Sequence, residues 1–445
     1  MDEISPFVVL WSKWRLNSKP LTVGLTPYTS RLMHIIVFED SLSPQLFPAT
    51  IARAACMINI GTYRLIDLVR RLGDSVEVIV RPYLKDLVFR DVPNLWTPDK
   101  GERTNPILAI NARAVPHVGL IEQLKRLIDE GRSGVVCGDN GVACALFARE
   151  HPFPHDFVGA SQLLGIITDL NLEPLNISVP MLEHVHDIVR YQIRILNDNL
   201  NDRLRCGHYK EIADGVFAAE DVNIGDYFSA DTKAGPIIFE SGVSIAPYCF
   251  FRGPVHVGTN VKIIEHSAMK DAVSLGSTCK VGGEVEAAII EAYSNKQHHG
   301  FLGHSYLGSW VNLGAGTCNS DLKNTYGEVT MEYANKKAKT GMQFVGCFIG
   351  DYAKTAINTS IFTGKTIGAC SMVYGFVTTN VPSFVNYARF FGQVTEVPVD
   401  IMIQTQARMF SRRNVEQRPC DVQLLRDIYE MTKHERQLAN EPLSL

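Results

Sequence analysis

Residues 245–287 read IAPYCFFRGPVHVGTNVKIIEHSAMKDAVSLGSTCKVGGEVEA, and an apolar side chain stands at every sixth position of this stretch. A period of six predicts a parallel β-helix, in which three short strands and three turns make one triangular coil. The side chain at the repeating position points into the coil, so stacked coils share one continuous apolar core. The repeating positions are Ile245, Phe251, Val257, Ile263, Met269, Leu275, Val281 and Ala287.

A second series and two interruptions mark the extent of this repeat. The frame breaks at residues 294–306, resumes at Leu307 and Leu313, and breaks again after Cys318. We expect both breaks to be loops that project from the β-helix, where functional residues tend to lie. The frame restarts with Ile349, Thr355, Ile361, Ile367 and Val373. The second series, four residues after each repeating position, is Cys249, Val255, Val261, Ser267, Val273, Cys279, Val285 and Glu291.

The rest of the chain differs from this repeat and divides into further segments. Residues 33–179 alternate strand-like and helix-like pieces, which predicts an α/β domain with a mostly parallel sheet. Residues 180–206 have the spacing of a long amphipathic helix that links this domain to the β-helix of residues 207–395. Residues 396–445 are rich in helix formers and predict C-terminal helices. Residues 1–32 fit none of these patterns, and we expect a non-native or disordered extension before a natural start at Met33.

The composition is that of an ordinary globular protein. The chain has 445 residues, 46% of them hydrophobic and 20% charged, with a formal net charge of −4. These values exclude global disorder and argue against a general nucleic-acid or polybasic membrane binder. No run approaches the roughly 18–20 apolar residues that cross a bilayer. The ten cysteines form no C-x-x-C pair, so we expect reduced thiols in a cytoplasmic protein.

The first break and the coil that follows it hold most of the residues suited to catalysis. Residues 293–306 read YSNKQHHGFLGHSY and residues 311–324 read VNLGAGTCNSDLKN. A neutral imidazole has a pKa of ~6.5 and accepts a proton near pH 7. The Gly-rich turn at 314–316 offers backbone N–H groups to a developing oxyanion.

Hexads with the sequence N-L-G-A-G-T-C-N resemble the left-handed β-helix acyltransferases, in particular the acetyltransferase half of the bifunctional bacterial enzyme that makes UDP-N-acetylglucosamine. The whole chain resembles the GlmU-like sugar nucleotidyltransferase/acyltransferase family, strongly over about residues 235–380 and only by the order of elements over residues 33–180. The resemblance implies a left-handed β-helix and transfer of an acetyl or other acyl group from acetyl-CoA to an amino sugar phosphate or nucleotide sugar. It also implies a homotrimer with sites between subunits.

The resemblance assigns roles to individual residues. Ala315 and Gly316 would face acetyl-CoA. The general base would stand in the coil before the N-L-G-A-G-T coil, where both His298 and His304 qualify and the spacing does not decide between them. Ser320 stands where the family has a Tyr. The residues expected to bind substrate are Asn295, Lys296, Tyr306, Asn312, Asn319 and Lys323.

Three alternatives remain open. The first is a zinc enzyme similar to the γ-class carbonic anhydrases, with His299, His304 and His266 as ligands. The second is nucleotidyl transfer by the α/β domain, alone or as a second activity, with Mg²⁺; however, no Gly-rich phosphate loop follows the first strand, where residues 38–44 read FEDSLSP. The third is a non-catalytic scaffold. The polar or glycine candidates in the α/β domain are Arg53, Gly61, Arg64 and Asp139, and structural roles are favoured for each.

Overall fold

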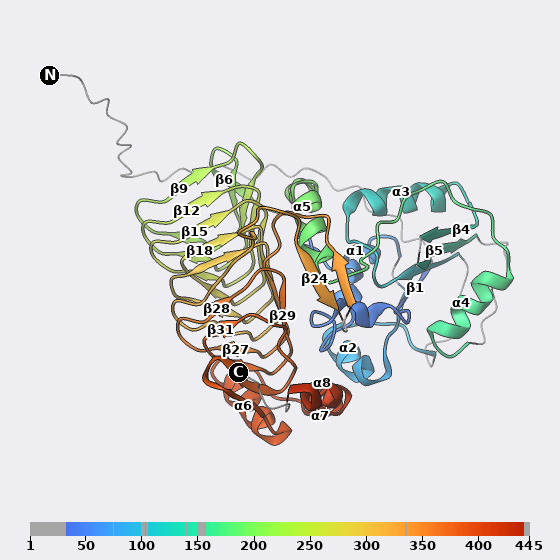
Figure 1. The fold of residues 1–445 in the computed structure, drawn as a ribbon. Coiled ribbons are helices and arrows are strands. Elements are labelled where there is room, and N and C mark those ends of the chain that lie inside the picture. Colours follow the sequence, from blue (N-terminus) through green and yellow to red (C-terminus); the bar gives the residue numbers. More distant parts are fainter. Residues whose placement is uncertain are drawn as a thin grey trace.

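The computed structural model describes residues 33–73, 75–98, 103, 106–138, 140–148, 153, 157–333 and 336–439. The expected extension of residues 1–32 and the candidate Asp139 lie outside these ranges. An α/β domain stands beside a long β-helix, and the C-terminal helices lie at one end of the β-helix (Figure 1). The predicted fold class, an α/β domain followed by a β-helix, is confirmed.

A five-stranded sheet in the order β2-β1-β3-β5-β4 organises the α/β domain. Strand β1 is buried at all five positions because its sequence, HIIVF, is apolar after the first residue. It pairs in parallel with both neighbours, whereas β5 is antiparallel to β3 and β4. The strands are β1 (His34–Phe38), β2 (Ser75–Ile79), β3 (Ile107–Asn111), β4 (Gly134–Gly138) and β5 (Gly141–Phe147). The helices are α1 (Leu65–Val69), α2 (Lys85–Asp91), α3 (Val118–Asp129) and α4 (Ala160–Asp169).

The linker helix α5 spans Asp187–Cys206, so it begins seven residues later than the predicted 180–206. The carboxylate of Asp187 accepts hydrogen bonds from the backbone N–H groups of Glu183 and His184, both at 2.9 Å, which holds the chain before the helix in a turn. Within α5, the Gln192 amide accepts from Gly61 N–H and donates to the hydroxyl of Ser274 in the β-helix. The helix is therefore hydrogen-bonded to both parts of the molecule.

The strands of the β-helix form three faces, the first, second and third sheet, and the first sheet faces the α/β domain and α5 (Figure 1). The first sheet contains β6 (Lys210–Ala213), β7 (Val216–Ala218), β10 (Ile237–Phe239), β13 (Val255–Val257), β16 (Val273–Leu275), β19 (Ile289–Ile290), β22 (Tyr306–Leu307), β26 (Cys347–Ile349) and β29 (Lys365–Ile367). The second contains β8 (Asn223–Ile224), β11 (Ser244–Ile245), β14 (Lys262–Ile263), β17 (Lys280–Val281), β20 (Asn295–Lys296), β27 (Lys354–Thr355), β30 (Met372–Val373), β32 (Val385–Ala388) and β33 (Gln393–Glu396). The third contains β9 (Ser229–Asp231), β12 (Phe250–Arg252), β15 (Ala268–Lys270), β18 (Glu284–Glu286), β21 (Phe301–Gly303), β23 (Cys318–Asn319), β28 (Ser360–Ile361) and β31 (Phe376–Val377).

The first break in the repeat is not a projecting loop, which corrects the sequence expectation. Strands β20 and β21 lie within residues 294–306, and the chain there continues the coil. The frame shifts because the coils differ in length. Val257 pairs with Leu275, eighteen residues on, whereas Leu275 pairs with Ile290 and Ile290 with Leu307, which are shorter steps of fifteen and seventeen residues.

The second break does leave the coil. Leu307 pairs with Ile349, and the inserted chain between them carries the antiparallel hairpin β24 (Thr330–Tyr333) and β25 (Lys336–Lys339). The hairpin extends from the β-helix toward α5 and the α/β domain (Figure 1). The side chains at the predicted inward positions, including Ile245, Phe251 and Ile349, are buried. The prediction is wrong at Ala287, because Val285 and not Ala287 is the strand partner of Met269.

The C-terminal helices are α6 (Val399–Ser411), α7 (Pro419–Met431) and α8 (Lys433–Ala439). Helix α6 packs on the β-helix through Phe410, whose ring centroid lies 4.5 Å from that of Trp310. Arg418, which caps α7, pairs with Asp91 of the α/β domain at 2.8 Å. Among the helices that the structure describes, none combines the length and the apolar character that a bilayer crossing requires.

A buried ion cluster joins the two domains. Arg53 of the α/β domain pairs with Glu291 at 3.1 Å and also with Asp351, and it donates to the hydroxyl of Ser309 at 3.0 Å. Glu291 additionally accepts from the backbone N–H of Asn59 at 3.0 Å. Glu291 is the one acidic member of the second sequence series, and in the structure its carboxylate is directed to the α/β domain. Arg53 is therefore a domain-joining residue.

Candidate functional site

A histidine–carboxylate pair lies where the second break begins. The Nδ1 atom of His304 is 2.8 Å from Oδ2 of Asp321, and the two side chains are 13% and 14% exposed. A carboxylate at this distance favours the tautomer with a proton on Nδ1, which leaves Nε2 free to accept a proton. The pair has the arrangement of a general base whose ring is oriented by a carboxylate.

The inserted segment holds this pair in place. The aromatic ring of Phe344 stacks on the imidazole of His304 with a centroid distance of 5.2 Å and an interplanar angle of 24°. The backbone N–H of Val345 donates to the carbonyl of Asp321, and that of Gly346 donates to the carbonyl of His304. These two backbone hydrogen bonds hold the end of the insertion against His304 and Asp321, and the ring of Phe344 covers one face of the imidazole. The side chain of His304 remains partly exposed.

The other predicted histidines lie at a different edge of the β-helix. His298 and His299 are exposed at the corner between the second and third sheets. The N–H of Gly316 donates to the carbonyl of His299, so this pair stands one coil before the N-L-G-A-G-T turn. His304 follows the opposite end of β21, at the corner between the third and first sheets.

The predicted zinc ligands do not come together. His266 stacks on Tyr248 with a centroid distance of 5.1 Å, whereas His299 and His304 stand at opposite ends of β21. In the described part of the chain, the one group of His, Cys, Asp or Glu side chains close enough to share a metal ion lies elsewhere. The geometry therefore gives the carbonic-anhydrase-like alternative no support.

Asn295 and Asn312 are neighbours on the outer side of the second sheet. The amide of Asn295 donates to Oδ1 of Asn312 at 3.4 Å and accepts from the guanidinium of Arg413 at 2.7 Å. Ala315 and Gly316 follow at the adjacent corner and are half-buried. These four predicted residues and His298 thus lie around one edge of the β-helix.

Two predicted substrate residues are directed into the β-helix instead. The ammonium group of Lys296 donates to the carbonyls of Gly282 and His298 at 2.7 and 2.9 Å, and burial lowers the pKa of Lys296 to about 8. The amide of Asn319 accepts from the N–H of Gly303 and donates to its carbonyl, at 2.9 and 3.1 Å. Both side chains satisfy backbone groups between coils.

Tyr306 and Lys323 also have structural partners. Tyr306 is buried between the domains, and its hydroxyl donates to the carboxylate of Glu291 at 3.2 Å. Lys323 donates to the carbonyl of Glu328 within the inserted segment at 2.6 Å. The structure therefore does not place these two residues with His304 Nε2 or with the Asn295–Asn312 pair.

Sequence reasoning missed Asp321, Phe344 and Arg413. The coil length is the signal that could have found Asp321: Asn295 neighbours Asn312, seventeen residues on, and the same step leads from His304 to Asp321. No local pattern pointed to Phe344, which lies in the inserted segment, or to Arg413, which follows the distant helix α6.

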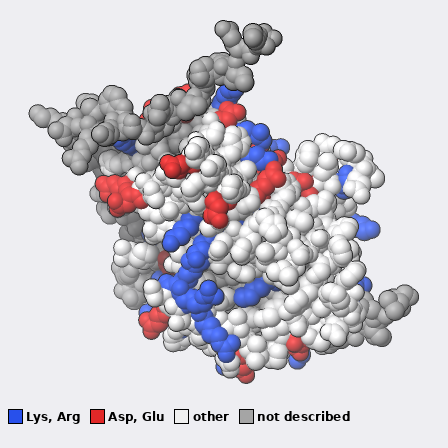
Figure 2. Space-filling view, turned by 90° about the vertical axis from the view of Figure 1, so that its left-hand side faces the viewer, with Lys and Arg blue, Asp and Glu red and all other residues white. Residues whose placement is uncertain are grey.

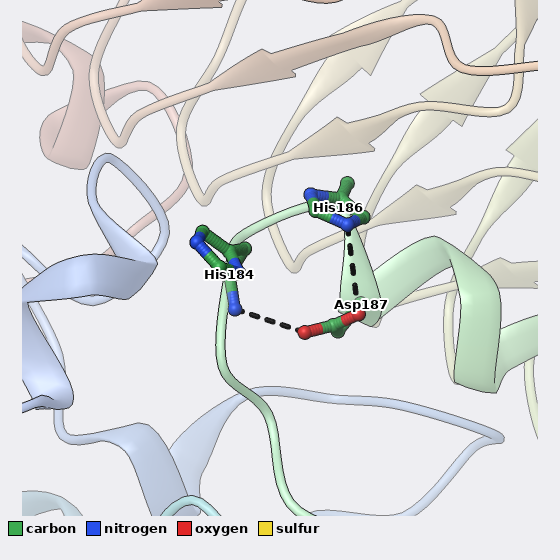
Figure 3. Close-up of side chains that lie close together, drawn as sticks. All are labelled: His184, His186 and Asp187. Carbon is green, nitrogen blue, oxygen red and sulfur yellow. Dashed lines mark hydrogen bonds and ion pairs between the residues drawn. The ribbon is translucent and has the colours of Figure 1, made fainter. Parts of the chain in front are cut away.

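The His184, His186 and Asp187 side chains gather at the start of α5 (Figure 3). The carboxylate of Asp187 is already occupied, because Arg190 donates to one oxygen and two backbone N–H groups donate to the other. The Nδ1 atom of His186 lies 2.5 Å from the hydroxyl of Tyr333 on the hairpin. These contacts make the cluster a junction between α5 and the hairpin. The positive charge of the Arg190 guanidinium beside Asp187 disfavours the binding of a metal ion there.

A cavity of about 300 Å³ lies between the end of the sheet and the start of α5, and Arg113, Asn140, Glu183 and Arg190 are among the residues that line it. The two acids that directly follow β1 are both paired. Arg113 donates to Asp40 at 2.6 Å, and Arg81 donates to Glu39 at 3.0 Å. Parallel α/β sheets bind ligands at this edge.

Comparison with known proteins supports both halves of the sequence expectation. Residues 35–203 match a family model described as "Sugar nucleotidyl transferase". The chain is 30% identical over 171 residues to a "Bifunctional sugar-1-phosphate nucleotidylyltransferase/acetyltransferase" of Sulfurisphaera tokodaii, which covers 38% of this chain and 42% of that protein. It is 28% identical over 194 residues to "Bifunctional protein GlmU" of Acinetobacter baumannii, which covers 42% of this chain and 39% of that protein.

A solved structure, the UDP-N-acetylglucosamine acyltransferase of Francisella novicida, matches with a TM-score of 0.23 and 16% identity, over 52% of this chain and 74% of that chain. The chain spans about two fifths of the length of the curated relatives named above. The resemblance predicted from the sequence is confirmed: this chain is similar to GlmU-like bifunctional nucleotidyltransferase/acetyltransferases, and its residues 35–203 match the sugar nucleotidyl transferases.

Proposed function

We propose that the β-helix transfers an acyl group, acetyl from acetyl-CoA, to an amino sugar phosphate or a nucleotide sugar, with His304 as the general base. The observation that carries this proposal is the 2.8 Å contact between His304 Nδ1 and Asp321 Oδ2. The names of the relatives, which include an acetyltransferase, support the reaction class.

The chemistry follows from the position of the imidazole. The acceptor nitrogen or oxygen attacks the thioester carbonyl of acyl-CoA, and Nε2 of His304 takes the proton that the acceptor loses. Asp321 stabilises the imidazolium that forms, because the charge develops beside its carboxylate. The carbonyl carbon gains a bond to the acceptor as its bond to sulfur breaks, and the proton on His304 can then pass to the departing CoA thiolate.

Acyl transfer is tested directly by release of CoA thiol from acetyl-CoA. The full chain would be mixed with amino sugar phosphates and nucleotide sugars in turn. Thiol release that depends on one acceptor supports the proposal. Absence of acceptor-dependent release from every acyl-CoA and sugar phosphate tested would favour the scaffold alternative.

Nucleotidyl transfer by the α/β domain is the second candidate. The family match over residues 35–203 favours it, and so does the cavity at the end of the sheet. The arginine pairs on Glu39 and Asp40 oppose it, because they engage both carboxylates that could hold Mg²⁺ at the end of β1. Release of pyrophosphate from a nucleoside triphosphate and a sugar 1-phosphate, with Mg²⁺, tests this activity separately.

We also propose a homotrimer and a cytoplasmic location. The candidate residues lie at two edges of the third sheet, with His304 at one and His298 and Ala315 at the other. A site between subunits would bring such edges together, which supports the trimer. Mass measurement in solution by light scattering tests it.

A further inference from the structure

The outer side of the second sheet carries a column of aligned polar side chains. Lys262 neighbours Lys280, Lys280 neighbours Asn295, and Asn295 neighbours Asn312. Adjacent strands lie ~4.8 Å apart, so these four positions span ~14 Å along the β-helix. Figure 2 shows the face of the molecule on the β-helix side, where lysines and arginines gather in a band.

The end of helix α6 adds two arginines beside this column. Arg412 and Arg413 directly follow α6, whose Phe410 packs on Trp310 of the β-helix. The guanidinium of Arg413 donates to the amide oxygen of Asn295 at 2.7 Å. Arg413 is therefore fixed beside the column, although it is more than a hundred residues away in sequence.

The cations in this group are not engaged in ion pairs. Among the residues that the structure describes, Lys262, Lys280, Arg412 and Arg413 form no ion pair with a carboxylate. Burial lowers the pKa of Lys280, and the positive charges of Arg413, Lys262 and Arg412 lower it further. The four cations repel one another, and an anion bound among them would relieve that repulsion.

We propose that Lys262, Lys280, Arg412 and Arg413, with the amide of Asn295, bind phosphate groups of a substrate. This proposal rests on the proposed acyl transfer and identifies the part of that site that holds phosphate. Guanidinium and ammonium groups bind phosphate oxygens through charge-assisted hydrogen bonds. The phosphate source is either the diphosphate and 3′-phosphate of CoA or the phosphate of the sugar acceptor.

The location of the group relative to the predicted site supports this role. Asn312 is followed in the column by Lys354 on the next strand, and Ala315 and Gly316 lie after Asn312 in the same coil at the next corner. A phosphate held at Lys280 would therefore lie within ~10 Å, or two strand spacings, of Asn312. The rest of a substrate of the proposed reaction can extend from there toward the corner.

Binding of inorganic pyrophosphate to the full chain, measured by calorimetry, tests the proposal without any acyl transfer. We expect Lys280→Gln and Arg413→Gln each to weaken binding about tenfold or more, because each removes a charged hydrogen-bond partner. Lys337→Gln, on the exposed strand β25, is the matched control and should leave binding unchanged. Arg412 is exposed at the surface, so Arg412→Gln serves as a further variant that does not disturb packing.

Two further comparisons identify the phosphate source. CoA against dephospho-CoA and glucosamine 1-phosphate against glucosamine would be measured with the same variants. If the variants bind only CoA more weakly than the wild type does, the group holds the phosphates of CoA. If they bind only glucosamine 1-phosphate more weakly, the group holds the phosphate of the sugar acceptor. Equal affinity of wild type, Lys280→Gln and Arg413→Gln for all of these ligands would overturn the proposal. A wrong assignment of His304 would leave these affinities unaffected.

Discussion

The imidazole of His304 lies 2.8 Å from the carboxylate of Asp321, although the two residues belong to consecutive coils of the β-helix. Seventeen residues separate them, which is the length of the coil at this point. The pair therefore depends on the local coil length, and the stacked ring of Phe344 adds to its order.

Replacing His304 by Ala should lower the rate of acyl transfer by ~10²–10⁴-fold, because a positioned general base contributes about that factor. The measurement is acceptor-dependent release of CoA thiol, with the melting temperature compared to exclude unfolding. Asp321→Asn should also lower kcat while leaving KM little changed, since Asp321 orients and stabilises the imidazole without touching the acceptor.

His298→Ala provides the matched comparison, because His298 is exposed and lies one coil before Ala315 at the other edge of the third sheet. A loss of less than about tenfold is expected for this variant. A large loss for His298→Ala together with a small one for His304→Ala would transfer the role of base to His298.

The six-residue repeat was enough to predict the β-helix, because each apolar side chain at that period must face one shared core. Residues such as Phe251, Leu275 and Ile367 are buried as the repeat predicts. The repeat was misleading from Ala287 to residue 306, where coils of fifteen and seventeen residues shift the frame without any loop. A fixed period cannot distinguish a shortened coil from an insertion.

The candidate site was only partly predictable, for a physical reason. His304 and Asn312 could be found because they lie in a contiguous motif. Asp321 required knowledge of the coil length, and Arg413 follows a helix whose packing on Trp310 no local pattern encodes. Lys296 was misleading, because a lysine in a motif can serve backbone carbonyls inside the fold as well as a ligand outside it.

Arg53→Met should destabilise the protein by about 3–5 kcal/mol, because it leaves the buried carboxylates of Glu291 and Asp351 without their cation. Denaturant unfolding monitored by circular dichroism gives the change. Arg64→Met is the control: the pair of Arg64 with Asp67 is more than a third exposed and should be worth at most about 1 kcal/mol. Equal, small losses for the two variants would show that the ion cluster does not hold the domains together.

Gly61→Ala should destabilise the protein more than Gly131→Ala, although both glycines have left-handed φ values, +57° and +65°. A Cβ atom on Gly61 would lie 2.6 Å from Cγ1 of Ile195 on α5, whereas nothing lies within 4 Å of one on Gly131. The backbone cost of about 1–2 kcal/mol is common to both, and overpacking should add about 1–3 kcal/mol at Gly61 alone. Chemical denaturation of the two variants measures the difference, and equal values would contradict the close packing of α5 on the α/β domain.

His186 should make the folded protein less stable in mild acid. Burial lowers the pKa of His186 to about 4, from an ordinary value of 6.5. As pH falls below 6.5, the unfolded chain takes up a proton at His186 while the folded chain does not, so the unfolded state is favoured increasingly until the pH nears 4. The contribution is absent above about pH 7 and reaches about 3 kcal/mol near pH 4.

The free energy of unfolding of His186→Gln should therefore fall less steeply between pH 6.5 and 4 than that of the wild type, because glutamine does not titrate. Tyr333→Phe is the matched control, since it removes the hydroxyl 2.5 Å from Nδ1 but keeps the buried imidazole. It should lower stability at every pH and retain the wild-type slope. If the free energies of unfolding of wild type and His186→Gln change in parallel with pH, His186 takes up its proton equally in the folded and unfolded chains. That result would contradict the burial of His186 at the junction of α5 with the hairpin.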